Sequence, residues 1–313
     1  MKKIFLSALC ILNFSFLILN CTAQQLSLSN QYTVNKFWLS PAYAGASGGF
    51  ETFGTFRSEW MNVPNAPETK YISADGMVCK NMGLGGSVST QQAGIFTNIS
   101  ASTSYAYHMQ MGTNMLSFGL GAGLIESHVD LSGADAQNDP VAMNSDVSDL
   151  ALDAGFGVLF RCKSLHAGFS IPRMLNTKIK DEDKSKVYSL GAHYRLHAGY
   201  AYTINADWAV DPALLINLPE NAPMYYELAV PIKYKQKMWA VPIYKKSAIA
   251  FGIGGMPYGN FTAQYSYEFS SKGIEGGSGG THEITIGWRM ASKKKSDTPA
   301  PDSKKPYYEW LNK

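Results

Sequence analysis

The chain has 313 residues, of which 45% are hydrophobic, 12% aromatic and only 16% charged, where a typical soluble domain carries roughly 25% charged residues. The mean hydropathy of −0.13 and the lack of an apolar run of about 20 residues after the N-terminal region exclude a bundle of membrane-spanning helices. The net charge of +3 comes from the two ends of the chain, so nucleic acid is not an expected partner. This composition favours an all-β protein whose surface faces lipid.

Residues 1–23 have the pattern of a secretory signal peptide. Two lysines precede an apolar stretch, residues 4–19, and Cys21-Thr22-Ala23 follows it. We predict cleavage after Ala23. The alternative is a lipoprotein modified at Cys21, which Asn20 disfavours because such sites prefer a small residue before the cysteine.

The remaining chain alternates apolar with small or polar residues, in segments of about ten residues that are separated by turns. The clearest segments span residues 116–124, 189–204, 261–269 and 283–289. A period of two predicts strands with one apolar and one wet face. The wet faces carry Gly, Ser, Thr and isolated charges, which suits a confined lumen, and the soluble β-sandwich is the alternative. Aromatic residues near segment ends fit interfacial girdles, including Trp60, Trp208, Trp239 and Trp288.

Long polar connectors alternate with tight turns along about 14 such segments, as in outer-membrane barrels with short periplasmic turns and long extracellular loops. Two short connectors, near Gln92 and Lys246, break the alternation. We predict one domain, residues 24–291, that forms a closed antiparallel transmembrane β-barrel of the outer-membrane type. Residues 24–49 are expected to be an N-terminal periplasmic segment, and residues 292–313 a basic and aromatic periplasmic tail. Both termini would then be periplasmic, in the outer membrane of a Gram-negative cell.

No catalytic, metal-binding or cofactor-binding residues are expected. Residues 276–280 match G-x-S-x-G but precede a strand, so we interpret them as a flexible loop and not as a nucleophile elbow. His193 and His197 lie four residues apart, and on a strand that spacing is about 13 Å, too far for one zinc ion. Aspartates between residues 130 and 149 lack the EF-hand spacing, which favours a solvated acidic loop over a calcium site. The protein is therefore not expected to be an enzyme.

Two features of the sequence stay open. Cys79 and Cys162 either pair or remain free thiols, and we favour the thiols. The tail ends in an aromatic cluster that includes Tyr307, Tyr308 and Trp310. The tail is either a disordered terminus or a flexible arm whose aromatic end docks on a partner.

Short motifs after the signal peptide resemble the PorP/SprF family of type IX secretion. They are Gln31-Tyr32, the sequence SPAYAG at residues 40–45, RSEW at 57–60 and APET at 66–69, and further similarity follows at 116–119, 138–140, 170–172 and 282–283. Ser40 and Glu59 depart from the Asn and Gln that the family usually has there. The matching positions are taken as structural or partner-binding candidates: Pro41, Tyr43, Gly45, Arg57, Trp60, His282 and Glu283. Because Pro41 fixes φ and Gly45 permits a tight turn, we expect this motif to shape the start of the first strand.

The resemblance implies a non-enzymatic outer-membrane component of the type IX secretion system that supports export or surface attachment of large proteins such as gliding adhesins. It implies as partners the membrane lipid, the periplasmic ring and peptidoglycan-linked components, and secreted cargo, with no cofactor. The alternatives are a general diffusion porin or small-molecule transport barrel and, as a weaker one, an outer-membrane hydrolase.

Overall fold

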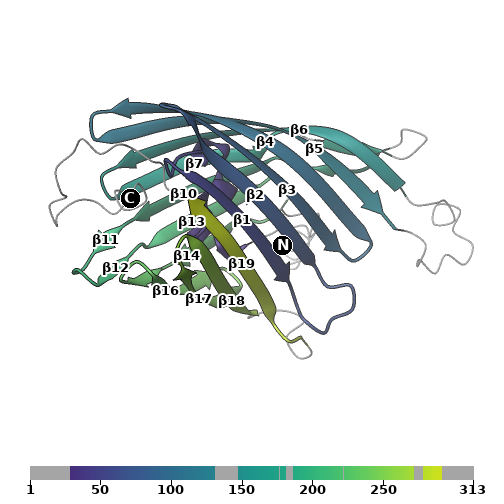
Figure 1. Ribbon diagram of the computed structural model, residues 1–313. Helices are drawn as coiled ribbons and strands as arrows, with labels where there is room; N and C mark the ends of the chain where they lie inside the picture. Colours follow the sequence, from purple (N-terminus) through teal and green to yellow (C-terminus); the bar gives the residue numbers. More distant parts are fainter. Residues whose placement is uncertain are drawn as a thin grey trace, which may run out of the picture.

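The computed structural model describes residues 29–130, 147–175, 177–180, 186–220, 222–270 and 278–290. These residues form a closed antiparallel β-barrel of 14 strands, as predicted (Figure 1). Each strand pairs with its neighbour in sequence, and pairing of β1 (Phe50–Ser58) with β19 (Thr281–Met290) closes the wall. No helix in the described ranges is long and apolar enough to cross a membrane.

The first half of the wall contains long, uninterrupted strands. They are β1, β2 (Glu68–Cys79), β3 (Met82–Ala93), β4 (Phe96–Met111), β5 (Asn114–Val129), β6 (Val147–Cys162) and β7 (Leu165–Arg173). A separate hairpin of β8 (Thr177–Lys180) and β9 (Lys186–Leu190) follows, and β8 contacts β6.

The second half is more irregular, because three of its strands are each divided in two. The segments are β10 (His193–Tyr200), β11 (Tyr202–Thr203), β12 (Trp208–Val210), β13 (Ala213–Pro219), β14 (Tyr225–Ala229), β15 (Ile232–Tyr234), β16 (Met238–Lys245), β17 (Ala248–Tyr258) and β18 (Phe261–Ser270). The breaks lie side by side at Ala201, Asp211-Pro212 and Val230-Pro231. Proline has no N–H to donate to the ladder, which accounts for the breaks at Pro212 and Pro231.

Apolar side chains of the strands point outward. Leu120 and Leu152 are 61% and 70% exposed, whereas the inward-facing Ser117 is fully buried. This is the arrangement predicted for a barrel whose outer face contacts lipid. Trp208 and Trp288 are exposed on the outer face, but Trp239 is buried inside the barrel, so its assignment to an interfacial girdle is wrong.

The barrel has two distinct ends. The turn end carries tight connections such as β4–β5 and β17–β18, and the loop end carries the long connections, including residues 59–67 and 271–280. In Figure 1 the turn end lies on the left and the loop end on the right. The short connections β3–β4 and β16–β17 lie at the loop end and account for the two exceptions in the predicted alternation.

Candidate functional site

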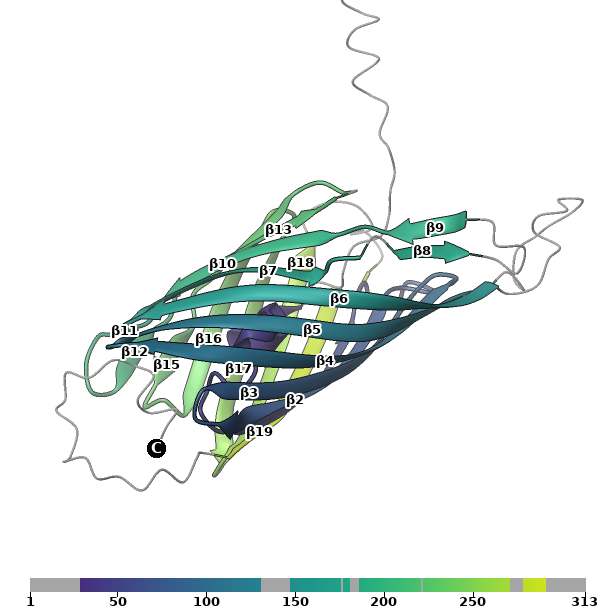
Figure 2. The same ribbon diagram turned by 90° about the horizontal axis from the view of Figure 1, so that it is seen from above.

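Residues 29–49, which we call the plug, lie inside the barrel. They form three 3-10 helices, η1 (Asn30–Thr33), η2 (Lys36–Leu39) and η3 (Pro41–Tyr43), seen in purple between the strands in Figure 2. Plug residues such as Phe37 and Leu39 form one apolar core with inward-facing wall residues. The expectation of a separate periplasmic segment at residues 24–49 is therefore corrected for residues 29–49, which lie in the lumen.

Local capping explains why the plug folds as short turns. The Ser29 hydroxyl accepts a hydrogen bond from the Gln31 N–H, and the Ser40 hydroxyl accepts one from the Ala42 N–H. Pro41 occupies the first turn of η3, where its missing N–H costs nothing. Gly45 has φ of +69°, a conformation that favours glycine. The SPAYAG motif thus shapes the plug, and not only the start of the first strand.

Glycines in the wall allow the plug to touch the strands directly. A Cβ at Gly119 would overlap the backbone of Pro41 and Ala42, and one at Gly83 would overlap the Ala44 carbonyl. Gly119 faces the lumen, as the alternation predicted, and Gly83 faces the lumen too. The structural reason for them is contact between backbones.

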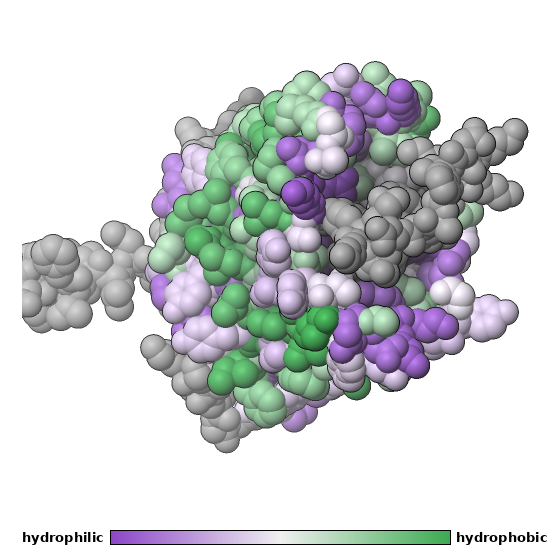
Figure 3. Space-filling model, turned by 90° about the vertical axis from the view of Figure 1, so that its left-hand side faces the viewer, coloured by the Kyte–Doolittle hydropathy of each residue, from purple (hydrophilic) through white to green (hydrophobic). Residues whose placement is uncertain are grey.

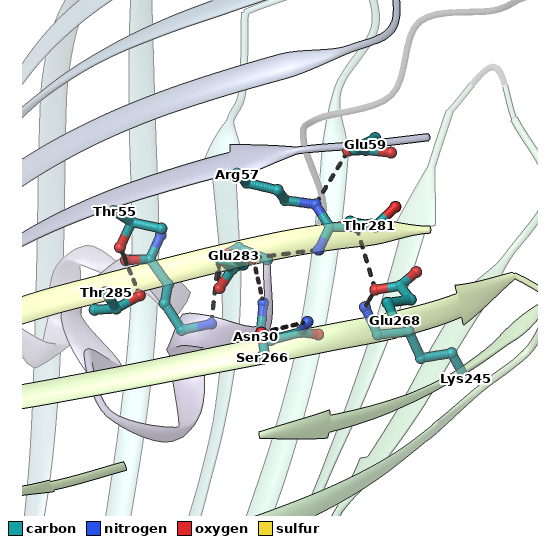
Figure 4. Close-up of polar contacts among 12 residues, drawn as sticks. Asn30, Thr55, Arg57, Glu59, Lys245, Ser266, Glu268, Thr281, Glu283 and Thr285 are labelled. Atoms are coloured by element: carbon teal, nitrogen blue, oxygen red, sulfur yellow. Dashed lines mark hydrogen bonds and ion pairs between the residues drawn. The ribbon is translucent and has the colours of Figure 1, made fainter. Parts of the chain in front are cut away.

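A buried ionic cluster fixes the start of the plug at the loop end of the barrel (Figure 4). The Glu283 carboxylate accepts hydrogen bonds from the Ser29 hydroxyl at 3.0 Å, the Asn30 N–H at 3.1 Å and the Arg57 guanidinium at 3.2 Å. Arg57 also pairs with Glu59 and Glu268. Arg57 and Glu283 are each only 1% exposed, so each charge needs the other to offset its lost hydration.

The same cluster continues to the neighbouring strands. Lys245 of β16 donates to Glu268 of β18 at 2.7 Å and lies 3.8 Å from Glu227 of β14. Charged groups from β1, β14, β16, β18 and β19 therefore meet around the first residues of the plug.

Further contacts hold the middle of the plug. Arg195 of β10 donates to the Trp38 carbonyl at 2.8 Å, and its guanidinium stacks 4.1 Å from the centre of the Trp38 ring. The Ser170 hydroxyl of β7 donates to the Leu39 carbonyl. The Tyr43 hydroxyl shares a 3.0 Å hydrogen bond with His197. Burial raises the pKa of Tyr43, so its phenol remains protonated and able to donate.

The last part of the plug is bound at the turn end. The Gly45 N–H donates to Asp75 of β2, and Arg161 of β6 donates to the Ala46 carbonyl, both at 2.8 Å. An earlier plug residue is bound there too: Arg289 of β19 donates to the Val34 carbonyl at 2.7 Å and pairs with Glu51. The plug thus runs through the lumen from the loop end to the turn end, where β1 begins.

The structure separates the candidate residues into two groups. Pro41, Tyr43 and Gly45 belong to the plug, and Arg57 and Glu283 meet beside its first residues. Trp60 and His282 lie at the loop end outside the lumen: the Trp60 N–H donates to Thr281, and His282 contacts Tyr265 and Gly279. The tail residues Tyr307, Tyr308 and Trp310 lie outside the described residues.

The structure also places the two cysteines, the two histidines and part of the G-x-S-x-G match. Cys79 and Cys162 are free thiols, as favoured. His193 and His197 both face the lumen, and the described part of the chain holds no group of His, Cys, Asp or Glu side chains placed to bind a metal. Of the G-x-S-x-G match, only residues 278–280 are described, and they lead directly into β19.

Several residues in and around the plug were not singled out from the sequence. Asp75, His108 and Asp211 of the wall contact the plug residues Gly45, Ala44 and Lys36, and Lys245 pairs with Glu268 in the ionic cluster. For Asp75 and Lys245 the usable signal was an isolated charge on the wet face of a strand.

A family model described as type IX secretion system membrane protein PorP/SprF matches residues 21–288. The chain belongs to the PorP/SprF family. It is therefore an outer-membrane β-barrel of the type IX secretion family. A search of curated protein sequences found no match.

The chain is similar in structure to several solved proteins. The toluene transporter TbuX of Ralstonia pickettii has a TM-score of 0.51 at 10% identity, covering 81% of this chain and 92% of TbuX. The toluene transporter TodX of P. putida has a TM-score of 0.48 at 9% identity, covering 82% and 92%. Omp33 of Acinetobacter baumannii has a TM-score of 0.45 at 7% identity, covering 77% and 97%. At these identities the likeness to TbuX shows the fold alone.

Proposed function

We propose that this protein is a non-enzymatic component of type IX secretion that binds secreted cargo at its loop end and periplasmic components at its turn end. It would support the export or surface attachment of large proteins such as gliding adhesins. Membership of the PorP/SprF family supports the secretion role. In outer-membrane barrels the long loops are extracellular and the short turns periplasmic, which supports the assignment of the two ends.

The observation that carries this proposal is the plug, which is bonded to the wall from one end of the lumen to the other. A diffusion porin needs a continuous aqueous channel, and residues 29–49 occupy that space. A plug bound inside the lumen therefore supports a binding role over the alternative of a porin or small-molecule transport barrel.

The proposed orientation also concerns the two ends of the chain. It leaves Met290, the last described residue of β19, on the periplasmic side, as the sequence predicted for the tail. It leaves Ser29 at the loop end, toward the cell surface, in contrast to the expectation that the N-terminus is periplasmic.

The experiment is affinity purification of the tagged full-length protein from native outer membranes, combined with planar-bilayer recordings. We expect a secreted surface protein and periplasmic components of the secretion machine to co-purify, and little conductance from the purified barrel. Steady conductance of an open pore, with no secretion component recovered above an unrelated tagged barrel, would refute the proposal in favour of a porin.

A further inference from the structure

A cavity opens at the turn end, between the plug and the ends of the strands, and we call it the rim cavity. Its volume is about 1000 Å³, including its open mouth. One part of the lining is apolar and includes Val34, Phe37, Val241 and Met256. Figure 3 shows this end of the molecule, where hydrophobic and hydrophilic residues lie side by side.

The rest of the lining carries an excess of positive charge. Lys36, Arg161, Lys233 and Arg289 line the rim cavity, with two carboxylates, Glu51 and Asp75. Asp211 pairs with both lysines at 3.4–3.7 Å, and Glu51 pairs with Arg289 at 2.9 Å. The four cationic groups and three carboxylates together have a net charge of +1. A ligand with a carboxylate beside apolar groups therefore complements the cavity.

Four buried polar side-chain atoms of the lining have no hydrogen-bond partner among the described residues: Ser47 Oγ, Asp75 Oδ1, Gln236 Oε1 and Arg289 Nε, the last of which forms an ion pair with Glu51. The two neutral oxygens are the Ser47 hydroxyl of the plug and the Gln236 side-chain carbonyl of the β15–β16 turn. Buried polar atoms without partners are rare in folded proteins. Both oxygens can accept hydrogen bonds from a polypeptide N–H.

We propose that the rim cavity binds the chain's own C-terminal aromatic segment, Tyr307-Tyr308-Glu309-Trp310-Leu311. The segment combines three aromatic rings and a leucine with one carboxylate. The rings and the leucine fill the apolar part of the cavity, where burial of apolar area stabilises them. The carboxylate of Glu309 offsets the net positive charge of the lining.

The point at which β19 ends supports an intramolecular contact. Arg289 lines the rim cavity and Met290 is the last described residue of β19, so the described chain ends beside the cavity. Sixteen residues, 291–306, separate Met290 from Tyr307, and a flexible linker of that length has an r.m.s. span of about 22 Å. Tethering at this distance gives an effective concentration on the order of millimolar, which a weak peptide contact needs in order to form.

The contact gives the tail a role that goes beyond the proposed function, because it holds whether or not the protein serves secretion. A periplasmic partner that binds the aromatic segment, or the rim cavity, has to displace this internal contact first.

The first test uses a labelled peptide of residues 306–313 and the purified barrel in detergent micelles. A chain that lacks residues 292–313 should bind this peptide, and the full-length chain should bind it about tenfold more weakly, because the tethered segment competes. The same peptide with Glu309→Lys should bind the truncated chain less tightly than the original. No binding to the truncated chain, or equal binding to both chains, would overturn the proposal.

The second test is disulfide trapping in the full-length chain with Cys79 and Cys162 replaced by serine. Asn312→Cys is paired with Ser47→Cys in the rim cavity or, as the matched control, with Ser164→Cys in the β6–β7 turn, which is at the same end but outside the cavity. We expect the intramolecular bond to Cys at position 47 to form about tenfold faster than the control bond. Equal rates would show an undocked tail, and a bond between two molecules would show docking onto a second copy. Either result refutes the proposal.

Discussion

Replacing Gly119 by alanine tests directly whether the plug touches the wall. A Cβ at this position overlaps the backbone of Pro41 and Ala42, which cannot rotate away as a side chain would. Overpacking of this kind costs about 1–3 kcal/mol, and we expect the upper part of that range because both contacting groups are backbone. Either the plug shifts or β5 bends, and both changes weaken the closed barrel.

Gly121→Ala is the matched control, because Gly121 lies on the same face of β5 two residues further on. Its added Cβ would lie 3.5 Å from the Gly155 backbone, an ordinary contact. Both variants should be compared by urea unfolding in detergent and by the temperature at which the folded band is lost on gels. We expect Gly119→Ala to lower the free energy of unfolding by about 2 kcal/mol more than Gly121→Ala. Equal stability of the two variants would refute the position of the plug.

Three further predictions follow from the same contacts. Glu283→Gln removes the carboxylate that binds Ser29, Asn30 and Arg57 and should lower the free energy of unfolding by about 2–4 kcal/mol. The control, Glu126→Gln on the exposed face of β5, should change the free energy of unfolding little. Similar losses in both variants would contradict the buried cluster. Tyr43→Phe removes the hydrogen bond to His197 and should cost about 1 kcal/mol in the same unfolding assay, and an unchanged stability would argue against that bond. An epitope inserted after Ala23 should bind antibody on intact cells, whereas one after Lys313 should need permeabilised cells, and the reverse pattern would invert the proposed orientation.

The sequence predicted the wall of the barrel well, because alternation is a local property. In β5, apolar Leu120 points outward and Ser117 inward, as the period of two required. The number of strands in the wall followed from the same pattern and from the turns between segments. The three divided strands did not change this number, because the chain keeps its direction across each break.

The position of Trp239 could not be predicted for a physical reason. In β16 the inward residues Trp239, Val241 and Ile243 are apolar, and the outward residues Met238 and Tyr244 are apolar or aromatic too. A strand with two apolar faces carries no periodic signal that distinguishes inside from outside. Its inner face is apolar because it packs on the plug, which the strand's own sequence does not reveal.

The plug was missed for a related reason. Residues 29–49 have neither the period of a strand nor that of an amphipathic helix. The sequence therefore predicted a periplasmic segment and not a part of the barrel interior. Their burial depends on wall residues that are distant in sequence, such as Ser170 and Glu283. Pro41, Tyr43 and Gly45 lie in the plug and Arg57 and Glu283 lie beside it, but their contacts with distant residues exist only once the barrel has closed.

The distribution of contacts along the plug bears on how the lumen could open. The plug is bound at the loop end by Glu283, in the middle by Arg195 and at the turn end by Arg161 and Arg289. Hydrogen bonds to charged groups contribute about 1.5–3 kcal/mol each, and every 1.4 kcal/mol changes a population tenfold. These bonds are spread along one continuous segment, residues 29–49, that leads into β1. The whole plug can therefore leave the lumen only if all of these bonds break. Spontaneous opening is therefore rare, and an open lumen requires a partner that binds the wall or the plug more favourably than they bind each other.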